Sequence, residues 1–287
     1  MLTRLELHFC MGTNLVSSMG KSIVTLTIMA SCLACAAAHA SPPTADLTVV
    51  ESTNTTVEKK TLKASFIQRQ MQNNASIGRA IKSIASHYPQ QVSTIVDVAL
   101  DTYPEKYKEI IYAAISAQPS HTEEIVRIAI EKGVTECPNI VELAIMAEPS
   151  YVNFVVTAAA DTTPEELKDI VRVAVITEPD SADRIVQTLA KEHPNDMVDI
   201  LTTAISAVPF VGEYIVDGLL ALFPNEADTV VENAVRESTE QREQIVRIIE
   251  AAEGQGMDAE ILKSSALKGG ATQEEIARAM DDDRSGN

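Results

Sequence analysis

The chain has 287 residues and a formal net charge of −18 at pH 7. Acidity of this size argues against nucleic acid as a partner, because phosphate neutralisation needs clustered Lys and Arg, and it argues equally against docking on anionic lipid. Apolar residues make up 45% of the chain, but aromatic residues only 4%, and Trp is absent. This balance favours thin, closely packed helices over a deep globular interior.

Residues 1–40 carry the three-part pattern of a secretory signal peptide. A basic start at Met19-Gly20-Lys21 precedes a largely apolar run from Ile23 to Ala38, and Ala38-His39-Ala40 forms an A-x-A-type cleavage site. We therefore expect the true start at Met19, cleavage after Ala40 and a periplasmic or secreted mature protein. The apolar run is too short and too rich in Ala, Ser and Thr for a membrane anchor, so no transmembrane segment is expected in the mature chain.

Cys32 offers an alternative to cleavage after Ala40, because lipid could be attached to it in Met29-Ala30-Ser31-Cys32. The residue three positions before this cysteine is Met rather than the Leu that such sites favour, so the lipoprotein is the less favoured reading. Cleavage after Ala40 leaves Cys137 as the single cysteine. The mature chain then has no internal disulfide and depends on packing for its stability.

Residues 41–73 lack hydrophobic periodicity and are rich in Ser, Thr, Asn and Gln, which predicts a flexible tether. A short helix around Leu62–Met71 is possible within it.

Residues 74–253 form a tandem array of 15-residue repeats. Taking proline as position 1, positions 7 and 8 hold Ile, Val or Leu in every proline-phased unit, and position 11 is Ala in most units. Slot 134 holds Val in place of proline, and the units at 74–88 and 239–253 are degenerate copies. The prolines that set the phase are Pro89, Pro104, Pro119, Pro149, Pro164, Pro179, Pro194, Pro209 and Pro224.

Each repeat is expected to be one short helix. The apolar positions 4, 7, 8, 11 and 12 lie on one face of a helix. Proline suits the first turn, where an N–H has no partner inside the helix, but it cannot stand in the interior and it pushes the preceding residue out of the α region. The spacing therefore predicts helices of about eleven residues, roughly 16 Å long.

A lone helix of this length is marginal in water, so each helix must bury its apolar stripe against its neighbours. The sequence therefore predicts an all-α fold, an α-solenoid of short helices. Links of about four residues favour antiparallel neighbours, which would pair the repeats as 30-residue helical hairpins. The expected stacking resembles HEAT-like and other α-solenoids in general terms, and no function is carried over from that resemblance.

Residues 254–287 are expected to form short helices and an acidic tail. Glycines punctuate two weak helical stretches, and Thr272-x-x-Glu275 is a capping-box pattern that opens the last helix, through about Met280. The carboxylates of Asp281-Asp282-Asp283 lack the spacing of a calcium loop, so a solvated tail is the preferred interpretation.

The sequence shows no catalytic constellation, cofactor motif or metal-ligand spacing. His87, His121 and His193 occupy three different repeat positions, so stacking of equivalent sites does not bring them together. Cys137 takes an apolar position of its repeat and is expected to be a small residue at the edge of the core. We therefore predict a non-enzymatic protein without cofactor or metal.

The unit at 209–223 departs from the others, because apolar residues stand at positions that are mostly polar elsewhere. A helix that is apolar on nearly all sides must be covered on all sides. Either a flanking segment packs over it, or it contacts a partner or a second copy. The candidate contact residues are Phe210, Val211, Tyr214, Leu222 and Phe223.

The function expected from these features is an exported scaffold that binds a protein or an envelope polymer through its solenoid surface. The alternative is a structural repeat protein that assembles end to end, since repeats without polar caps can stack between chains. The degenerate units at 74–88 and 239–253 look like caps, which weighs against the alternative.

Overall fold

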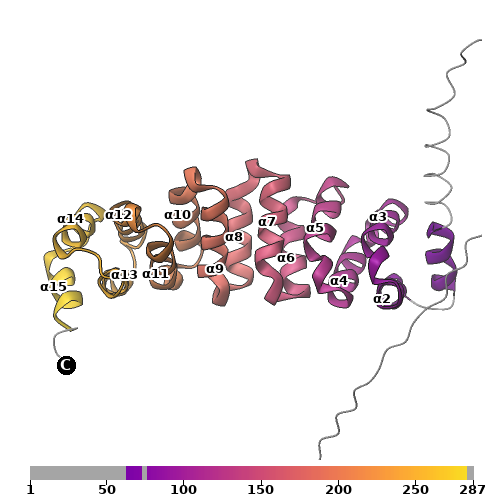
Figure 1. Ribbon diagram of the computed structural model, residues 1–287, viewed down its shortest axis with the longest axis horizontal. Helices are drawn as coiled ribbons and strands as arrows, with labels where there is room; N and C mark the ends of the chain where they lie inside the picture. The colour runs from indigo at the N-terminus through magenta and orange to yellow at the C-terminus, as the bar shows by residue number, and fades with distance from the viewer. Residues whose placement is uncertain (1–62, 73–75, 283–287) are drawn as a thin grey trace, which may run out of the picture. The chain divides into compact units, whose positions relative to one another are not determined.

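The computed structural model describes residues 63–72 and 76–282 of the chain (Figure 1). The chain divides into two units, 1–47 and 48–287, and all described residues belong to the second. The expected signal peptide, its cleavage site, Cys32 and residues 41–62 of the expected tether lie outside the described residues. So do residues 283–287 of the expected acidic tail.

The described residues are all-α, without a strand, as the repeat predicts. Most repeat units form an α-helix of eleven residues preceded by a single 3-10 turn that begins at the proline. The α-helices are α2 Ile77–His87, α3 Val92–Thr102, α4 Tyr107–Ala117, α5 Thr122–Glu131, α6 Cys137–Ala147, α7 Val152–Thr162, α8 Leu167–Thr177, α9 Ala182–Glu192, α10 Met197–Ala207, α11 Gly212–Leu222, α12 Ala227–Glu237, α13 Arg242–Gly254, α14 Ala259–Gly269 and α15 Gln273–Asp282. The 3-10 turns are η1 Pro89–Gln91, η2 Pro104–Lys106, η3 Pro119–His121, η4 Pro149–Tyr151, η5 Pro164–Glu166, η6 Pro179–Ser181, η7 Pro194–Asp196, η8 Pro209–Val211 and η9 Pro224–Glu226.

The joint between α7 and α8 shows how proline separates the helices. Thr163, the residue before Pro164, leaves the α region at φ −135° and ψ 67°. Its N–H still donates to the Ala159 carbonyl at 2.9 Å, and the Glu166 N–H donates to the Thr163 carbonyl at 3.0 Å. The steric demand of the proline ring therefore ends one helix, while the backbone hydrogen bonds of the joint remain satisfied.

The joint without proline, between α5 and α6, is built differently. Gly133 adopts a positive φ of 58° after α5, which only glycine reaches without strain. Chain direction then changes over Val134 and Thr135, and Pro138 falls in the first turn of α6. A left-handed glycine thus replaces the proline turn at this position.

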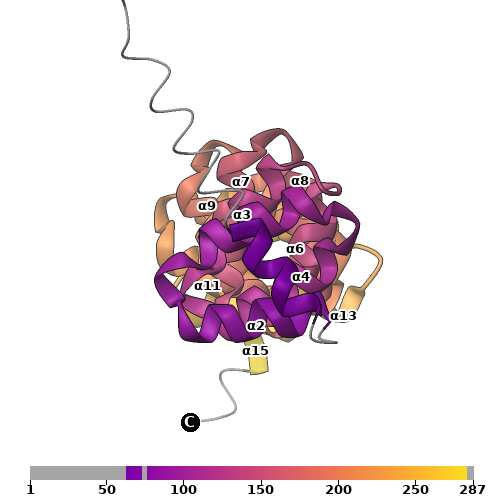
Figure 2. The same ribbon diagram turned by 90° about the vertical axis from the view of Figure 1, so that its right-hand side faces the viewer.

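Two layers of helices make up the stack. Each helix packs against the second helix before it and the second helix after it in the chain, as well as against its immediate neighbours. The even-numbered helices α2 to α14 therefore form one layer, and the odd-numbered helices α3 to α15 form the other (Figures 1 and 2). Consecutive helices are antiparallel partners, so the structural unit is the 30-residue hairpin.

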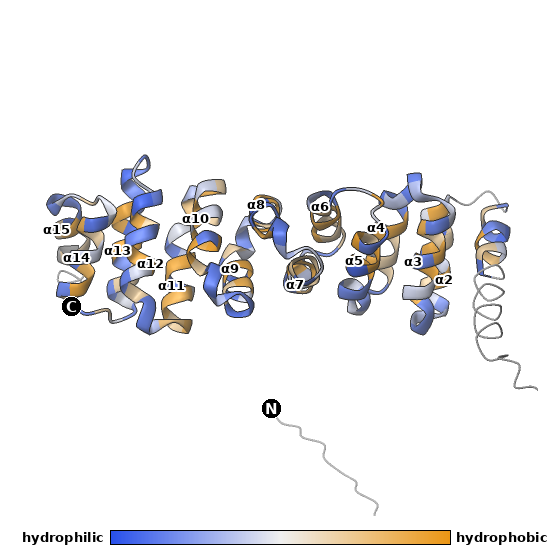
Figure 3. Ribbon diagram, turned by 90° about the horizontal axis from the view of Figure 1, so that it is seen from above, coloured by the Kyte–Doolittle hydropathy of each residue, from blue (hydrophilic) through white to orange (hydrophobic). Residues whose placement is uncertain are grey.

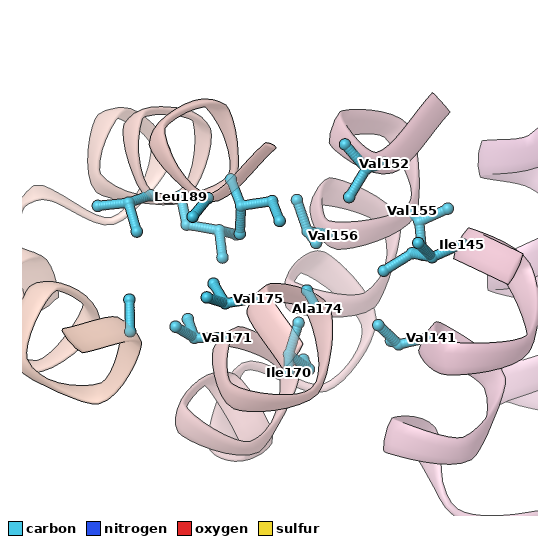
Figure 4. Close-up of a cluster of buried hydrophobic side chains, with 14 of the residues drawn as sticks. Val141, Ile145, Val152, Val155, Val156, Ile170, Val171, Ala174, Val175 and Leu189 are labelled. Carbon is cyan, nitrogen blue, oxygen red and sulfur yellow. The ribbon is translucent and has the colours of Figure 1, made fainter. Parts of the chain in front are cut away.

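The core lies between and within these layers. Positions 7, 8, 11 and 12 of the units supply it, and in α8 these are Ile170, Val171, Ala174 and Val175, all fully buried. Figure 4 shows them pointing toward Val141 and other aliphatic side chains of neighbouring helices. Each helix in Figure 3 carries hydrophobic and hydrophilic residues, as an amphipathic repeat requires.

The stack continues beyond the repeat that the sequence recognises. α13, which covers the degenerate unit 239–253, is not the terminal helix, because α15 packs on it and α14 packs on α12. The expectation that this unit caps the array is therefore wrong. α14 and α15 lack the proline phase, yet they bury apolar residues such as Leu262 and Ile276 against the preceding pair.

The capping box at the start of α15 is confirmed. The Thr272 N–H donates to Glu275 Oε2 at 2.8 Å, and the Glu275 N–H donates to Thr272 Oγ1 at 3.2 Å. Near the other end of the chain, residues 63–72 form a helix, in the region where the sequence leaves a short helix possible, and its Ile67 is buried in the core.

Candidate functional site

The apolar unit 209–223 forms η8 and α11 in the odd layer, between α9 and α13. Phe210 and Tyr214 are 59% and 60% exposed, one helical turn apart on the outer face. Leu222 is 43% exposed, whereas Phe223 is partly buried against the core. No segment among the described residues covers the two exposed rings.

The five candidate contact residues do not form one patch. Val211 is only 3% exposed and belongs to the core, because the third residue of a proline turn packs inward, as buried Ser181 does in η6. Leu222 follows Phe210 by twelve residues, which separates them by roughly 18 Å along the helix. The structure therefore brings Phe210 and Tyr214 together and leaves Leu222 and Phe223 at the far end of α11.

A groove of about 360 Å³ lies beside Phe210 and Tyr214, between α9 and α11. One wall comes from the unit at 179–193 and the other from the unit at 209–223. The residues that line it are Pro179, Asp180, Asp183, Gln187, Phe210, Val211, Tyr214, Asp217 and Gly218.

The groove exists because helices of one layer are stacked at an interval of 30 residues. Residue i in α9 faces residue i + 30 in α11, so Asp180 shares its repeat position with Phe210, and Gln187 shares its position with Asp217. Gly218 has no side chain, and the Gln187 amide occupies the space that a β-carbon there would fill. A small residue at this position thus lets a long polar side chain cover part of the wall.

The lining is acidic. Asp217 accepts a hydrogen bond from Gln255 Nε2 at 2.5 Å. For Asp180 and Asp183 we find no ion pair or side-chain hydrogen bond within the described residues. Two carboxylates of the groove are therefore exposed to a ligand without an internal competitor.

Two arginines approach the groove from outside but are held by other groups. Arg184 Nη2 donates to Ser181 Oγ at 2.6 Å, and Arg247 Nη1 lies 3.6 Å from Glu213 Oε1. Hydrogen bonding to Glu213 raises the pKa of Tyr214, so its phenol is protonated at neutral pH. The groove thus combines two aromatic rings, unpaired carboxylates and a neutral hydroxyl.

The other candidate chemistries are not assembled. Cys137 is buried, its sulfur accepts a hydrogen bond from Thr163 Oγ1 at 3.2 Å, and burial raises the pKa of the thiol above its ordinary value. His87 and His121 bond within their own units, to the Ser83 carbonyl at 2.7 Å and near Glu124 at 3.6 Å. Over residues 63–72 and 76–282, no three His, Cys, Asp or Glu side chains gather in a way that could hold a metal ion.

Sequence reasoning missed the α9 side of the groove. Asp180, Asp183 and Gln187 looked like ordinary exposed positions of an acidic repeat. A signal was present, because a pairing interval of 30 residues places them beside the aromatic unit, but the sequence alone left that interval as one possibility. A second set of exposed apolar residues, Tyr112, Met146 and Ile176, lies on the even layer and also escaped notice.

Comparison with protein-family models, with curated proteins and with solved structures finds no match to this chain. Among the helices that the structure describes, none has the length and apolar character to span a membrane.

Proposed function

We propose that this protein is an exported, non-enzymatic scaffold that binds another envelope component through the outer face of its odd layer. The observation that carries the proposal is the groove between α9 and α11, with the exposed rings of Phe210 and Tyr214 at its edge. Exposed aromatic side chains beside a concave, partly polar surface are typical of binding sites.

The proposal of export rests on the signal-peptide pattern of residues 1–40. Expression of the whole chain in a bacterial host, followed by fractionation and N-terminal sequencing, tests it. Recovery in the periplasm or medium with Ser41 as the first residue supports export. Retention of an intact N-terminus in the cytoplasm would remove it.

The proposal of binding is tested with the tagged chain from residue 41 onward, which contains every described residue. It is used to capture components from the envelope fraction of its source. We expect a reproducible bound component that is lost with Tyr214→Glu. Tyr112→Glu is the matched control, because Tyr112 is 47% exposed and lies on the opposite layer.

Circular dichroism must show unchanged helicity in both variants for the comparison to count. If Tyr214→Glu is folded and retains the component, the α9–α11 face is not the binding surface. If Tyr112→Glu loses it as well, the contact is either on both layers or non-specific, and the proposal for this face fails.

One observation favours self-assembly as a second candidate. Ile261 and Leu267 are exposed on α14, the last even-layer helix that the structure describes. Light scattering on the chain from residue 41 separates the two functions. A mass that rises with concentration, and falls with Ile261→Lys, supports end-to-end assembly, whereas a concentration-independent monomer excludes it.

A further inference from the structure

We infer that the groove between α9 and α11 binds a partner polypeptide by receiving one of its Lys or Arg side chains, held between Asp180 and Asp183 on one wall and Phe210 and Tyr214 on the other. This inference rests on the proposed binding function and names the chemical class of its ligand.

The first argument is electrostatic. Asp180 is exposed and Asp183 is half-buried at the mouth of the groove, and neither carboxylate has an ion pair among the described residues. Asp217 adds a third carboxylate that is engaged only by the neutral Gln255 amide. The groove therefore attracts cations, and the net charge of −18 draws basic partners toward the surface as a whole.

The second argument concerns the aromatic rings. Phe210 and Tyr214 border the same groove as the carboxylates, at positions that are polar in most other units. An ammonium or guanidinium group gains from contact with an aromatic face as well as from a charge-assisted hydrogen bond to carboxylate. The two features together select a cation with an apolar stem, which describes Lys and Arg side chains.

The third argument is size. A volume of about 360 Å³ lies at the small end of the range typical of ligand sites, about 300–1,000 Å³. It accommodates a long side chain and part of its backbone, and it does not accommodate a folded element. A neutral sugar chain would also stack on the rings, but it would leave Asp180 and Asp183 without a counter-charge.

The experiment measures binding of short synthetic peptides to the chain from residue 41 by fluorescence anisotropy. The probes are a fluorescein-labelled Gly-Ser peptide with three spaced Arg residues, the same peptide with Lys, and the same peptide with Glu. Chitohexaose, added as a competitor, represents a sugar polymer. We expect the Arg and Lys peptides to bind and the Glu peptide and chitohexaose to have no effect.

Matched variants separate the site from the general negative charge. The double variant Asp180→Asn with Asp183→Asn should weaken Arg-peptide binding at least tenfold. The double variant Glu105→Gln with Glu142→Gln removes the same charge from exposed positions of the even layer and should change binding less than twofold. Phe210→Ala should weaken binding, whereas Tyr214→Phe, which keeps the ring, should leave it nearly unchanged.

Each result decides the inference. Equal weakening by the two double variants would show that the peptides respond only to net charge, and the site would be rejected. Displacement by chitohexaose, or no peptide binding at all, would reject a cationic ligand. In that case a Tyr214-dependent component captured from the envelope would leave the proposed binding function standing, whereas its absence would remove both.

Discussion

Gly218 lies directly beneath the side chain of Gln187, although the two residues belong to different helices and are 31 positions apart in the chain. A β-carbon at Gly218 would come within 2.1 Å of Gln187 Nε2 and 2.9 Å of its Cδ. The pair forms part of the groove wall between α9 and α11. Its geometry gives the groove a feature that can be altered without touching any charged or aromatic residue.

Gly218→Ala is expected to change binding more than stability. Alanine favours the helix interior over glycine by about 1 kcal/mol, and the Gln187 amide is the far end of a flexible side chain that can rotate away. We expect the free energy of unfolding to shift by less than about 1 kcal/mol. The displaced Gln187 should narrow the groove and weaken Arg-peptide binding by about fivefold, which corresponds to about 1 kcal/mol.

Gly254→Ala is the control for this substitution, because no atom lies within 4 Å of a β-carbon placed there. It should bind the peptide as the unmodified chain does. Equal binding by both variants would show that the Gln187 position does not shape the site.

The close approach of neighbouring helices depends on alanine at position 11. Ala174 is fully buried in α8 among aliphatic side chains of adjacent helices (Figure 4). Ala174→Leu should lower the free energy of unfolding by about 1–3 kcal/mol or more, because the added methyl groups have no space without moving a neighbour. Urea denaturation measures the loss, and Ala277→Leu at an exposed position of α15 should change stability by less than about 0.5 kcal/mol.

The start of α15 should show a defined pH dependence. Burial raises the pKa of Glu275, but hydrogen bonds from the Thr272 N–H, Arg242 and the Thr272 hydroxyl outweigh it, so the pKa lies below its ordinary value in the folded chain. A carboxyl with a depressed folded pKa stabilises the fold above its unfolded pKa, about 4.3, and that contribution is lost as pH falls through the folded pKa.

Hydrogen exchange of the amides in α15 measures this local contribution. At pH 7, Glu275→Gln should exchange faster than the unmodified chain, because the amide keeps the cap but loses the charge opposite Arg242. The difference, after correction for intrinsic exchange rates, should shrink below about pH 4. A difference that stays constant from pH 7 to pH 3 would contradict the ionic part of the explanation.

Cys137 should be chemically silent in the folded protein. The thiol is buried, its pKa is raised by burial, and thiolate is the form that reacts with disulfide reagents. The chain from residue 41, which carries this one cysteine, should react with Ellman's reagent at a rate set by unfolding. Denaturation in guanidinium should make the reaction fast, whereas fast labelling of the native protein would place the thiol at the surface.

Local rules carried much of the architecture. Proline at a 15-residue interval ends each helix at the residue before it, and the Ile-Val-Ala stripe gives every helix one face to bury, so helix length and all-α class follow from residues near in sequence. The Thr272–Glu275 capping box is also local, because both partners lie within one turn.

The sequence by itself therefore determined where each repeat helix begins and ends and which face it buries, since these depend on interactions spanning a few residues. Only the tertiary structure decided that helices 30 residues apart lie side by side, that Val211 is buried while Phe210 is exposed, and that α14 and α15 extend the stack. It alone placed Asp180 and Asp183 beside Tyr214. The physical reason is that apolar faces of similar composition can be buried against several neighbours, and the choice among them depends on the packing of the whole stack.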